Sequence, residues 1–253
     1  MPVEVVNGVR LHTQALGRSG SRLVLVHGML LGALSSWYFT CAPFLARRRR
    51  VLMYDLRGHG LSEVPPTGYR LSDQSAELAE LLRLVANGER VSVVGHSFGG
   101  AIALRFALDF PELVERVVVV EAPLPLSGEG SVDFAHSLTH ETAIALLPPP
   151  LQRAFDAPGR RAARLQQRTH RLIYETTIGD DLQAEPDIDD AELATIDRDV
   201  LLCYARHSGL QASGERLAAV LPRSTLEMFE TSHYLPNEAP AALAARIEAF
   251  LDA

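Results

Sequence analysis

The sequence predicts an α/β protein with a mostly parallel central sheet, flanking helices and an inserted helical segment. Short apolar runs, typical of strands buried on both faces, alternate with helix-like stretches, and this alternation favours a parallel sheet. A chain of 253 residues with 47% hydrophobic residues suits a single α/β domain. The alternation breaks once, in a long stretch without a clear strand, and then resumes.

The first half of the chain carries most of the expected elements. Val3–Val6 and Val9–Leu16 flank an Asn7-Gly8 pair, which favours the positive φ angles of a hairpin turn. Ser72 is the expected N-cap of a helix at 71–86, and Pro111 helps to end a helix that begins at residue 98. Buried strands are expected at residues 23–26, 51–54, 91–94 and 117–120, and helices at 37–46, 71–86 and 98–108.

Residues 122–197 interrupt this order. They contain three consecutive prolines, Pro148 to Pro150, several glycines and polar helical segments, but no clear strand. We interpret them as a mostly helical cap inserted into an α/β core formed by residues 1–121 and 198–253. The earlier order then resumes, with strands expected at 200–205 and 225–229 and helices near 213–220 and 239–251.

The composition argues against nucleic-acid and membrane partners. The formal net charge is -7, whereas nucleic-acid binders usually gather basic residues on one face. The basic run at 47–50 is expected to be the solvated C-terminal end of a helix. No secretion signal opens the sequence, and no uncharged apolar stretch of about 18 residues occurs. We expect a soluble, cytoplasmic protein with Cys41 and Cys203 as buried free thiols.

One motif indicates a nucleophile. Gly95-His96-Ser97-Phe98-Gly99 joins a valine-rich strand directly to an apolar helix, in the pattern Gly-x-Ser-x-Gly. A serine at so sharp a turn has a strained backbone, and the glycines avoid collisions with neighbouring elements. Ser97 is therefore expected to project above the sheet, beside the positive end of the helix that begins at Phe98.

With this motif the chain resembles the α/β-hydrolase superfamily over essentially its full length. His27-Gly28-Met29, directly after a predicted strand, is similar to the family's oxyanion loop, which implies that the N–H groups of Met29 and Phe98 stabilise an oxyanion. The run from Asp55 to Ser62 resembles the family's D-x-R-G-x-G-x-S turn. That turn is structural in the family, so Asp55, Arg57 and His59 are assigned to the scaffold rather than to the chemistry.

The resemblance also implies a general base. His233 follows the last predicted strand and precedes the last helix, where the family places its catalytic histidine. An imidazole is needed to take the proton of a serine hydroxyl, and a carboxylate is needed to orient that imidazole.

The carboxylate departs from the usual family position. Most members carry an aspartate shortly after the strand at 200–205, but residues 205–210 contain no acid, and Asp199 lies at the wrong end of that strand. Glu121, which ends the strand beside the elbow strand, is the preferred acid. Its Glu-x-Pro context, Glu121-Ala122-Pro123, is similar to that of zearalenone lactonases. The alternative is a strand-end glutamate that caps a helix or pairs with an arginine.

No metal or cofactor is expected. His136 and His140 stand one helical turn apart near Asp133, but the pair lacks the glutamate of the zinc-protease signature and an evident third ligand. His96 is expected to pack beneath the elbow.

The substrate is predicted to be a small ester-like molecule with a hydrophobic portion. An apolar cap suggests a closed site, and the residues expected to bind substrate are Gly28, Leu30, Leu138, Tyr174 and Tyr234. The sequence does not choose among ester, lactone and thioester, since all react through the same acyl-enzyme. It also makes no prediction of the oligomeric state.

Two other classes remain open. The fold also hosts non-hydrolytic enzymes of C–C cleavage, lyase or acyl-transfer type, and receptor-like modules that bind small molecules. Haloalkane dehalogenases and epoxide hydrolases of the family attack with an aspartate at the elbow, so Ser97 argues against their chemistry.

Overall fold

A computed structural model of the chain describes residues 2–124, 139, 141, 144 and 149–253. Its strands are β1 (Val3–Val6), β2 (Val9–Leu16), β3 (Arg22–Val26), β4 (Arg50–Tyr54), β5 (Val91–His96), β6 (Val114–Val120), β7 (Val200–Ala205) and β8 (Ser224–Phe229). Among the described residues they form an eight-stranded sheet in the order β1-β2-β4-β3-β5-β6-β7-β8. The pairs β1–β2 and β2–β4 are antiparallel and the remaining pairs are parallel, so the predicted fold class is confirmed.

The N-terminal hairpin forms as the sequence predicts. Asn7 and Gly8 have φ angles of 49° and 81°, and Val6 pairs with Val9 across the turn. Asparagine and glycine tolerate this left-handed conformation better than other residues do, which explains the sharp reversal. The hairpin extends the sheet on the side of β4.

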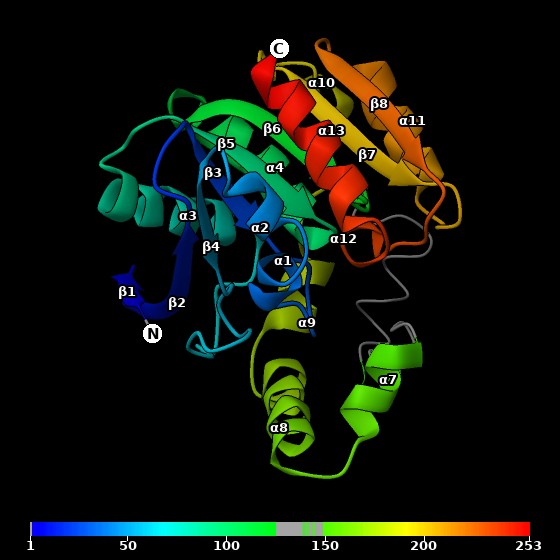
Figure 1. Cartoon of the computed structure of the whole chain (residues 1–253). Coiled ribbons are helices and arrows are strands. Elements are labelled where there is room, and N and C mark those ends of the chain that lie inside the picture. Colours follow the sequence, from blue (N-terminus) through cyan, green and yellow to red (C-terminus); the bar gives the residue numbers. More distant parts are fainter. Residues whose placement is uncertain (1, 125–138, 140, 142–143, 145–148) are drawn as a thin grey trace.

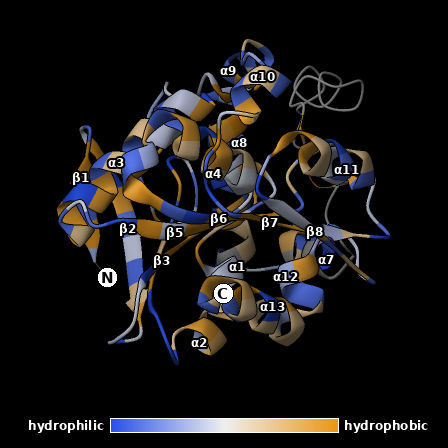
Figure 2. Cartoon of the chain, turned by 90° about the horizontal axis from the view of Figure 1, so that it is seen from above, coloured by the Kyte–Doolittle hydropathy of each residue, from blue (hydrophilic) through white to orange (hydrophobic). Residues whose placement is uncertain are grey.

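Helices cover both faces of the sheet (Figure 2). One face packs against α3 (Leu71–Ala86), α4 (Phe98–Asp109) and α11 (Gln211–Val220), and the other against α1 (Ser35–Tyr38), α2 (Ala42–Leu45), α12 (Leu235–Glu238) and α13 (Pro240–Asp252). Two apolar clusters result, one around Leu78 and Phe106 and the other around Trp37 and Leu243. Because both faces are covered, the central strands are rich in apolar residues, and all six residues of β5 are buried.

Two expectations for the helices are wrong. The single helix expected at 37–46 is divided into α1 and α2, because Pro43 in the first turn of α2 has no N–H to continue a helical hydrogen-bond ladder. The N-cap of α3 is Arg70 rather than Ser72, and the Arg70 N–H donates to the Asp73 carboxylate at 3.3 Å. A short 3₁₀ helix, Pro111–Leu113, follows α4.

The segment between β6 and β7 contributes α7 (Pro149–Asp156), α8 (Arg160–Tyr174), α9 (Ile178–Gln183) and α10 (Asp190–Leu193). Figure 1 shows α7 and α8 lying away from the sheet, below it in this view. Arg168 of α8 donates to the backbone carbonyls of His59 and Ser62, which ties this segment to the loop after β4. The described part of residues 122–197 contains no strand, and the division of the chain into core and cap stays a prediction.

The two cysteines are buried and free, as expected. Burial raises the pKa of the Cys41 thiol to about 12 and also raises that of Cys203, so neither sulfur is an available thiolate at neutral pH. No helix in the described ranges is long and apolar enough to cross a membrane.

A buried ion pair joins the loop after β4 to α3. Arg57 Nη2 lies 2.6 Å and Arg57 Nε 3.1 Å from Oε2 of Glu77, while Arg57 Nη1 donates to the carbonyl of Thr67 at 2.9 Å. Burial raises the pKa of Glu77, whereas the Arg57 guanidinium lowers it. On balance the pKa of Glu77 is raised, and the arginine offsets part of the cost of burying this carboxylate.

We expect Arg57→Ala to lower the free energy of unfolding by about 3–5 kcal/mol, because it leaves Glu77 buried without its cation. Urea unfolding followed by circular dichroism measures this. Arg10→Ala is the control, since the Arg10–Glu63 pair is largely exposed and its loss should cost about 1 kcal/mol or less. Equal effects of the two substitutions would contradict the assignment.

Candidate active site

Ser97 lies at the junction of β5 and α4 with φ 55° and ψ −125°. This backbone conformation is unfavourable for any residue other than glycine, so contacts with neighbouring residues must hold Ser97 in it. The Ser97 N–H donates to the carbonyl of Val120 at 2.8 Å, which ties the turn to the neighbouring strand β6. The predicted sharp strand-to-helix turn is therefore present.

The glycines of the motif allow this close packing. A Cβ at Gly95 would lie 2.0 Å from the carbonyl oxygen of Gly99, and a Cβ at Gly99 would lie 2.5 Å from that of Val26. Both distances are too short for any side chain. Larger residues would force α4 away from β5 and from the end of β3.

His233 lies in the loop between β8 and α12, as expected. The loop is held by Glu238, which accepts hydrogen bonds from the backbone N–H of Ser232 at 2.8 Å and from its hydroxyl. The backbone carbonyl of His233 accepts from Nε2 of His96 at 2.8 Å. His96 is buried near the elbow, and in addition it fixes the loop that carries His233, a contact that the sequence analysis missed.

Glu121 directly follows β6 and is fully buried, with φ 54°. Its Oε1 accepts from the backbone N–H of Ala205 at 2.6 Å and from the hydroxyl of Ser208 at 3.1 Å. Its Oε2 lies 3.1 Å from Nδ1 of His233. Three donors from β7 and the two loops that follow β7 and β8 thus surround one carboxylate, which compensates for its burial.

The three side chains form a hydrogen-bonded series. His233 Nε2 lies 3.1 Å from Ser97 Oγ, and His233 Nδ1 lies 3.1 Å from Glu121 Oε2. A carboxylate can only accept, so the proton sits on Nδ1, and Nε2 is free to accept from the serine hydroxyl. Such an arrangement can turn a serine hydroxyl into a nucleophile.

The loop after β3 passes beside Ser97. A Cβ at Gly28 would lie 3.1 Å from the Cβ of Ser97. Within the described ranges, neither the Met29 N–H nor the Phe98 N–H donates a hydrogen bond. Leu30 has φ 65°, and its N–H donates to Nε2 of His59 at 2.8 Å. The Met29 and Phe98 N–H groups are thus unpaired within the described residues, and their role in an oxyanion hole stays a prediction.

The other residues predicted to bind substrate have different environments. Tyr234 follows His233 and packs its ring edge-on against that imidazole, with the two ring centroids 5.5 Å apart. Tyr174 is half exposed at the end of α8, with its ring against His170. Leu138 lies outside the described residues. Their role in substrate binding stays a prediction.

Three histidines at the site are buried and neutral. Burial lowers the pKa of His59 and of His96 to about 3, and it lowers the pKa of His27 as well. A charged imidazole would be costly in these positions. They therefore act as fixed neutral hydrogen-bonding groups at ordinary pH.

The described residues contain no group of three or more His, Cys, Asp or Glu side chains that could hold a metal ion. His136 and His140, the one histidine pair with suitable spacing, lie outside the described residues, so the structure does not test them.

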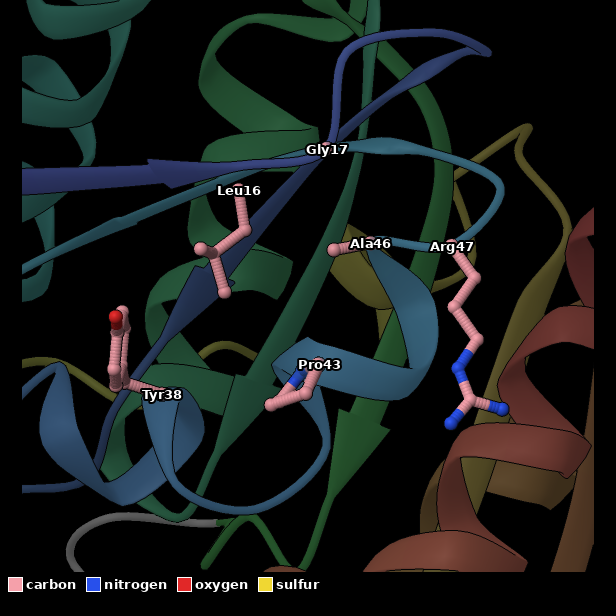
Figure 3. A pocket seen from close by; sticks show the side chains of 6 residues that line it. All are labelled: Leu16, Gly17, Tyr38, Pro43, Ala46 and Arg47. Atoms are coloured by element: carbon pink, nitrogen blue, oxygen red, sulfur yellow. The ribbon is translucent and has the colours of Figure 1, made fainter.

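A surface pocket of about 370 Å³ lies between the end of β2 and the helices α1 and α2 (Figure 3). Its lining residues are Leu16, Gly17, Tyr38, Pro43, Ala46 and Arg47. None of them belongs to the series of Ser97, His233 and Glu121, and none carries a carboxylate. The pocket is also near the amino ends of β3 and β4, whereas Ser97 and Glu121 follow the carboxyl ends of β5 and β6. We do not assign catalysis to it.

Comparisons with known proteins agree with this architecture. Residues 21–201 match the family model described as alpha/beta hydrolase fold. An uncharacterized protein of Mycobacterium tuberculosis is 29% identical over 288 residues, which cover 98% of this chain and 80% of that protein. A soluble epoxide hydrolase of Corynebacterium sp. is 38% identical over 119 residues, which cover 46% of this chain and 40% of that enzyme. Among solved structures, an enol-lactonase from Burkholderia xenovorans has a TM-score of 0.79 at 22% identity, with 100% of both chains covered.

The buried histidines predict a loss of stability in acid. The His96 pKa of about 3 lies below the ordinary histidine pKa of 6.5, so between these values the unfolded chain binds a proton that the folded protein does not. The free energy of unfolding should fall as pH drops below 6.5, by at most about 1.4 kcal/mol per pH unit for each such histidine.

Comparing wild type with His96→Gln in urea unfolding between pH 4 and pH 8 isolates this contribution. Between about pH 4 and pH 6 the free energy of unfolding of the variant should fall less steeply with decreasing pH than that of the wild type, by the contribution of close to one proton. Above pH 7.5, where the unfolded imidazole is neutral, the two curves should run parallel. Identical slopes throughout would show that His96 is not a buried neutral group.

Proposed function

The chain belongs to the α/β-hydrolase fold family, and we propose that it is a serine hydrolase that cleaves a carboxylic ester-type acyl bond through an acyl-enzyme. In this proposal Ser97 is the nucleophile, His233 the general base and Glu121 the acid of the triad. The backbone N–H groups of Met29 and Phe98 form the oxyanion hole. The substrate is a small molecule with a hydrophobic portion, and no cofactor takes part.

One observation carries the proposal, namely the continuous series from Glu121 through His233 to Ser97, with both links 3.1 Å long. Attack of Ser97 Oγ on the acyl carbon would transfer the hydroxyl proton to His233 Nε2. The buried Glu121 carboxylate would stabilise the imidazolium, and the backbone donors would stabilise the oxyanion. The imidazolium would then protonate the leaving group. A water molecule activated by the same imidazole would release the acid and regenerate Ser97.

The acyl bond could belong to an ester, a lactone or a thioester. The enol-lactonase of similar fold supports including lactones. The partial match to an epoxide hydrolase does not lead us to propose epoxide hydrolysis, because Ser97 stands at the elbow where epoxide hydrolases carry an aspartate. The resemblance of Glu121-Ala122-Pro123 to zearalenone lactonases has no support among the comparisons, so we do not extend the proposal to that substrate class.

We also propose that residues 122–197 act as a cap that closes the substrate site and that Gly28, Leu30, Tyr174 and Tyr234 contact substrate. Docking of α8 onto the loop after β4 through Arg168 supports this role for the cap. We further propose that the protein is cytoplasmic, that its substrate is a small molecule in solution, and that it has no nucleic-acid or membrane partner.

A non-hydrolytic enzyme is the second candidate. The same serine and histidine could support C–C cleavage, a lyase reaction or acyl transfer, and the family is known for more than one chemistry. A receptor-like binding module is the third, and it would release product slowly and only once per protein molecule. Incorporation of ¹⁸O from labelled water into the acid product distinguishes hydrolysis from a lyase or acyl-transfer reaction. Release of more than one product molecule per protein molecule distinguishes an enzyme from a receptor-like module.

The first test is covalent labelling by a fluorophosphonate. We expect the intact mass of the wild type to increase by one phosphonyl group, and we expect no increase for Ser97→Ala, because only an activated serine attacks this reagent. Ser35→Ala is the control, since Ser35 is an exposed residue of α1, and it should label at the wild-type rate. A wild type that does not label under conditions where it is folded would contradict the proposed function.

The acid is tested by Glu121→Gln. The glutamine oxygen can still accept from Ala205 and Ser208, but its NH₂ group then faces His233 Nδ1 and can only donate. His233 would carry its proton on Nε2 and could no longer accept from Ser97, so kcat/KM on an activated ester should fall by about 10⁴.

Glu115→Gln is the matched control, because Glu115 lies exposed on the same strand, β6. It should leave kcat/KM unchanged, and both variants should keep the wild-type far-ultraviolet spectrum. Normal turnover by Glu121→Gln would mean that another carboxylate serves the base.

A further inference from the structure

The loop after β3 and the turn after β4 hold each other through two buried imidazoles. His27, in the first segment, accepts from the Leu56 N–H at 3.0 Å, and His59, in the second, accepts from the Leu30 N–H at 2.8 Å. The ring centroids of the two histidines lie 5.4 Å apart. The contact is therefore reciprocal, since each segment gives one imidazole and one backbone N–H to the other.

Backbone carbonyls determine the tautomer of both rings. Nδ1 of His27 lies 2.6 Å from the carbonyl oxygen of Gly28, and Nδ1 of His59 lies 2.8 Å from that of Arg57. A carbonyl can only accept, so each Nδ1 carries the proton and each Nε2 keeps a lone pair. Both rings are buried and their pKa values are lowered, so they stay neutral and Nε2 remains an acceptor at ordinary pH.

These bonds fix the two peptide groups on either side of the Met29 Cα. His27 holds the carbonyl of the Gly28–Met29 peptide, and His59 holds the N–H of the Met29–Leu30 peptide. In a trans peptide the N–H points opposite to the C=O, so holding the Gly28 carbonyl toward His27 turns the Met29 N–H away from it. That N–H donates no hydrogen bond within the described part of the chain.

Leu30 needs such support. Its φ of 65° is unfavourable for a residue with a branched side chain, and the turn is closed on the other side by a hydrogen bond from the Gly32 N–H to the Met29 carbonyl at 3.3 Å. Without the acceptor on His59, the Leu30 N–H would be left unpaired and the loop could relax.

We propose that His59 is a positioning residue of the oxyanion hole, which holds the Leu30 N–H and thereby fixes the orientation of the neighbouring Met29 N–H toward the reacting oxygen. This inference rests on the proposed function, in which Met29 donates to the oxyanion. His59 belongs to the run from Asp55 to Ser62 that the sequence analysis assigned to the scaffold alone. It acts through the loop and does not touch the substrate.

The turn has other supports, so a change at His59 can be separated from unfolding. Asp55 accepts from the N–H groups of Leu34 and Leu61 at 2.7 Å and 2.8 Å and from Nδ1 of His12 at 2.7 Å. These bonds do not involve His59. We therefore expect conservative substitutions of His59 to fold.

Substitution of His59 by glutamine or by asparagine separates the two hydrogen bonds of the imidazole. The side-chain amide of glutamine reaches the position of Nε2, so His59→Gln can still accept from Leu30. The shorter amide of asparagine reaches the position of Nδ1, so His59→Asn keeps the bond to the Arg57 carbonyl but loses the acceptor for Leu30. His12→Asn is the control, because it alters a buried imidazole that bonds to the same turn and, within the described structure, has no hydrogen bond to residues 28–32.

The readouts are kcat and KM for an activated ester and the inhibition constant of a trifluoromethyl ketone, whose hemiketal oxygen occupies an oxyanion hole. We expect His59→Asn to lower kcat by about 10- to 100-fold with KM little changed, since removing one oxyanion donor outright costs about 10²- to 10³-fold. The inhibition constant should rise by the same factor. His59→Gln and His12→Asn should both stay within about five-fold of wild type.

Hydrogen exchange of the Leu30 amide, measured at residue resolution, checks the cause without relying on turnover. Exchange should be slow in the wild type and in His59→Gln and faster in His59→Asn. If His59→Asn keeps the wild-type kcat and inhibition constant, His59 is structural only and the inference is wrong. The same holds if His59→Asn and His59→Gln lose activity equally, in parallel with a loss of stability. If the wild type neither labels with a fluorophosphonate nor binds the ketone, the proposed function fails, and the inference fails with it.

Discussion

The site depends on unfavourable backbone conformations held at the carboxyl ends of three neighbouring strands. Ser97 after β5, Glu121 after β6 and Leu30 in the loop after β3 have φ angles of 55°, 54° and 65°. The sheet pairs β3 with β5 and β5 with β6. Each of these conformations costs of order 1–3 kcal/mol, so the parallel sheet and its two helical layers must supply the rigidity that keeps them in place.

Hydrogen bonds across the sheet provide that rigidity and place the polar groups. The Ser97 N–H donates to the Val120 carbonyl, and the Glu121 N–H donates to that of Cys203. Each strand end is therefore fixed to the next strand, and the side chains that leave these ends converge on His233. Around them, His27, His59 and His96 supply neutral acceptors and donors where water is excluded. A charged group in their place would disturb the field around Ser97 and His233.

Most of the fold could be predicted because each strand and helix follows from local pattern. The runs of apolar residues located the strands within a few residues, and the Asn7-Gly8 pair located the hairpin turn. The errors concern where helices begin and end, which neighbouring residues within a single turn decide. Pro43 divided a helix that was expected to be continuous. At the start of α3, the expected cap was the side chain of Ser72, but the Asp73 carboxylate accepts from the backbone N–H of Arg70 instead.

The sequence by itself determined the fold class, the elbow at Ser97 and the short list of groups that could serve it, because strand, turn and helix there are adjacent in the chain. Only the tertiary structure decided which groups meet. Glu121 and His233 are 112 residues apart, and His59 and Leu30 are 29 apart. A hydrogen bond requires placement to within a few tenths of an ångström. That placement comes from strand register and loop packing, which no local pattern specifies.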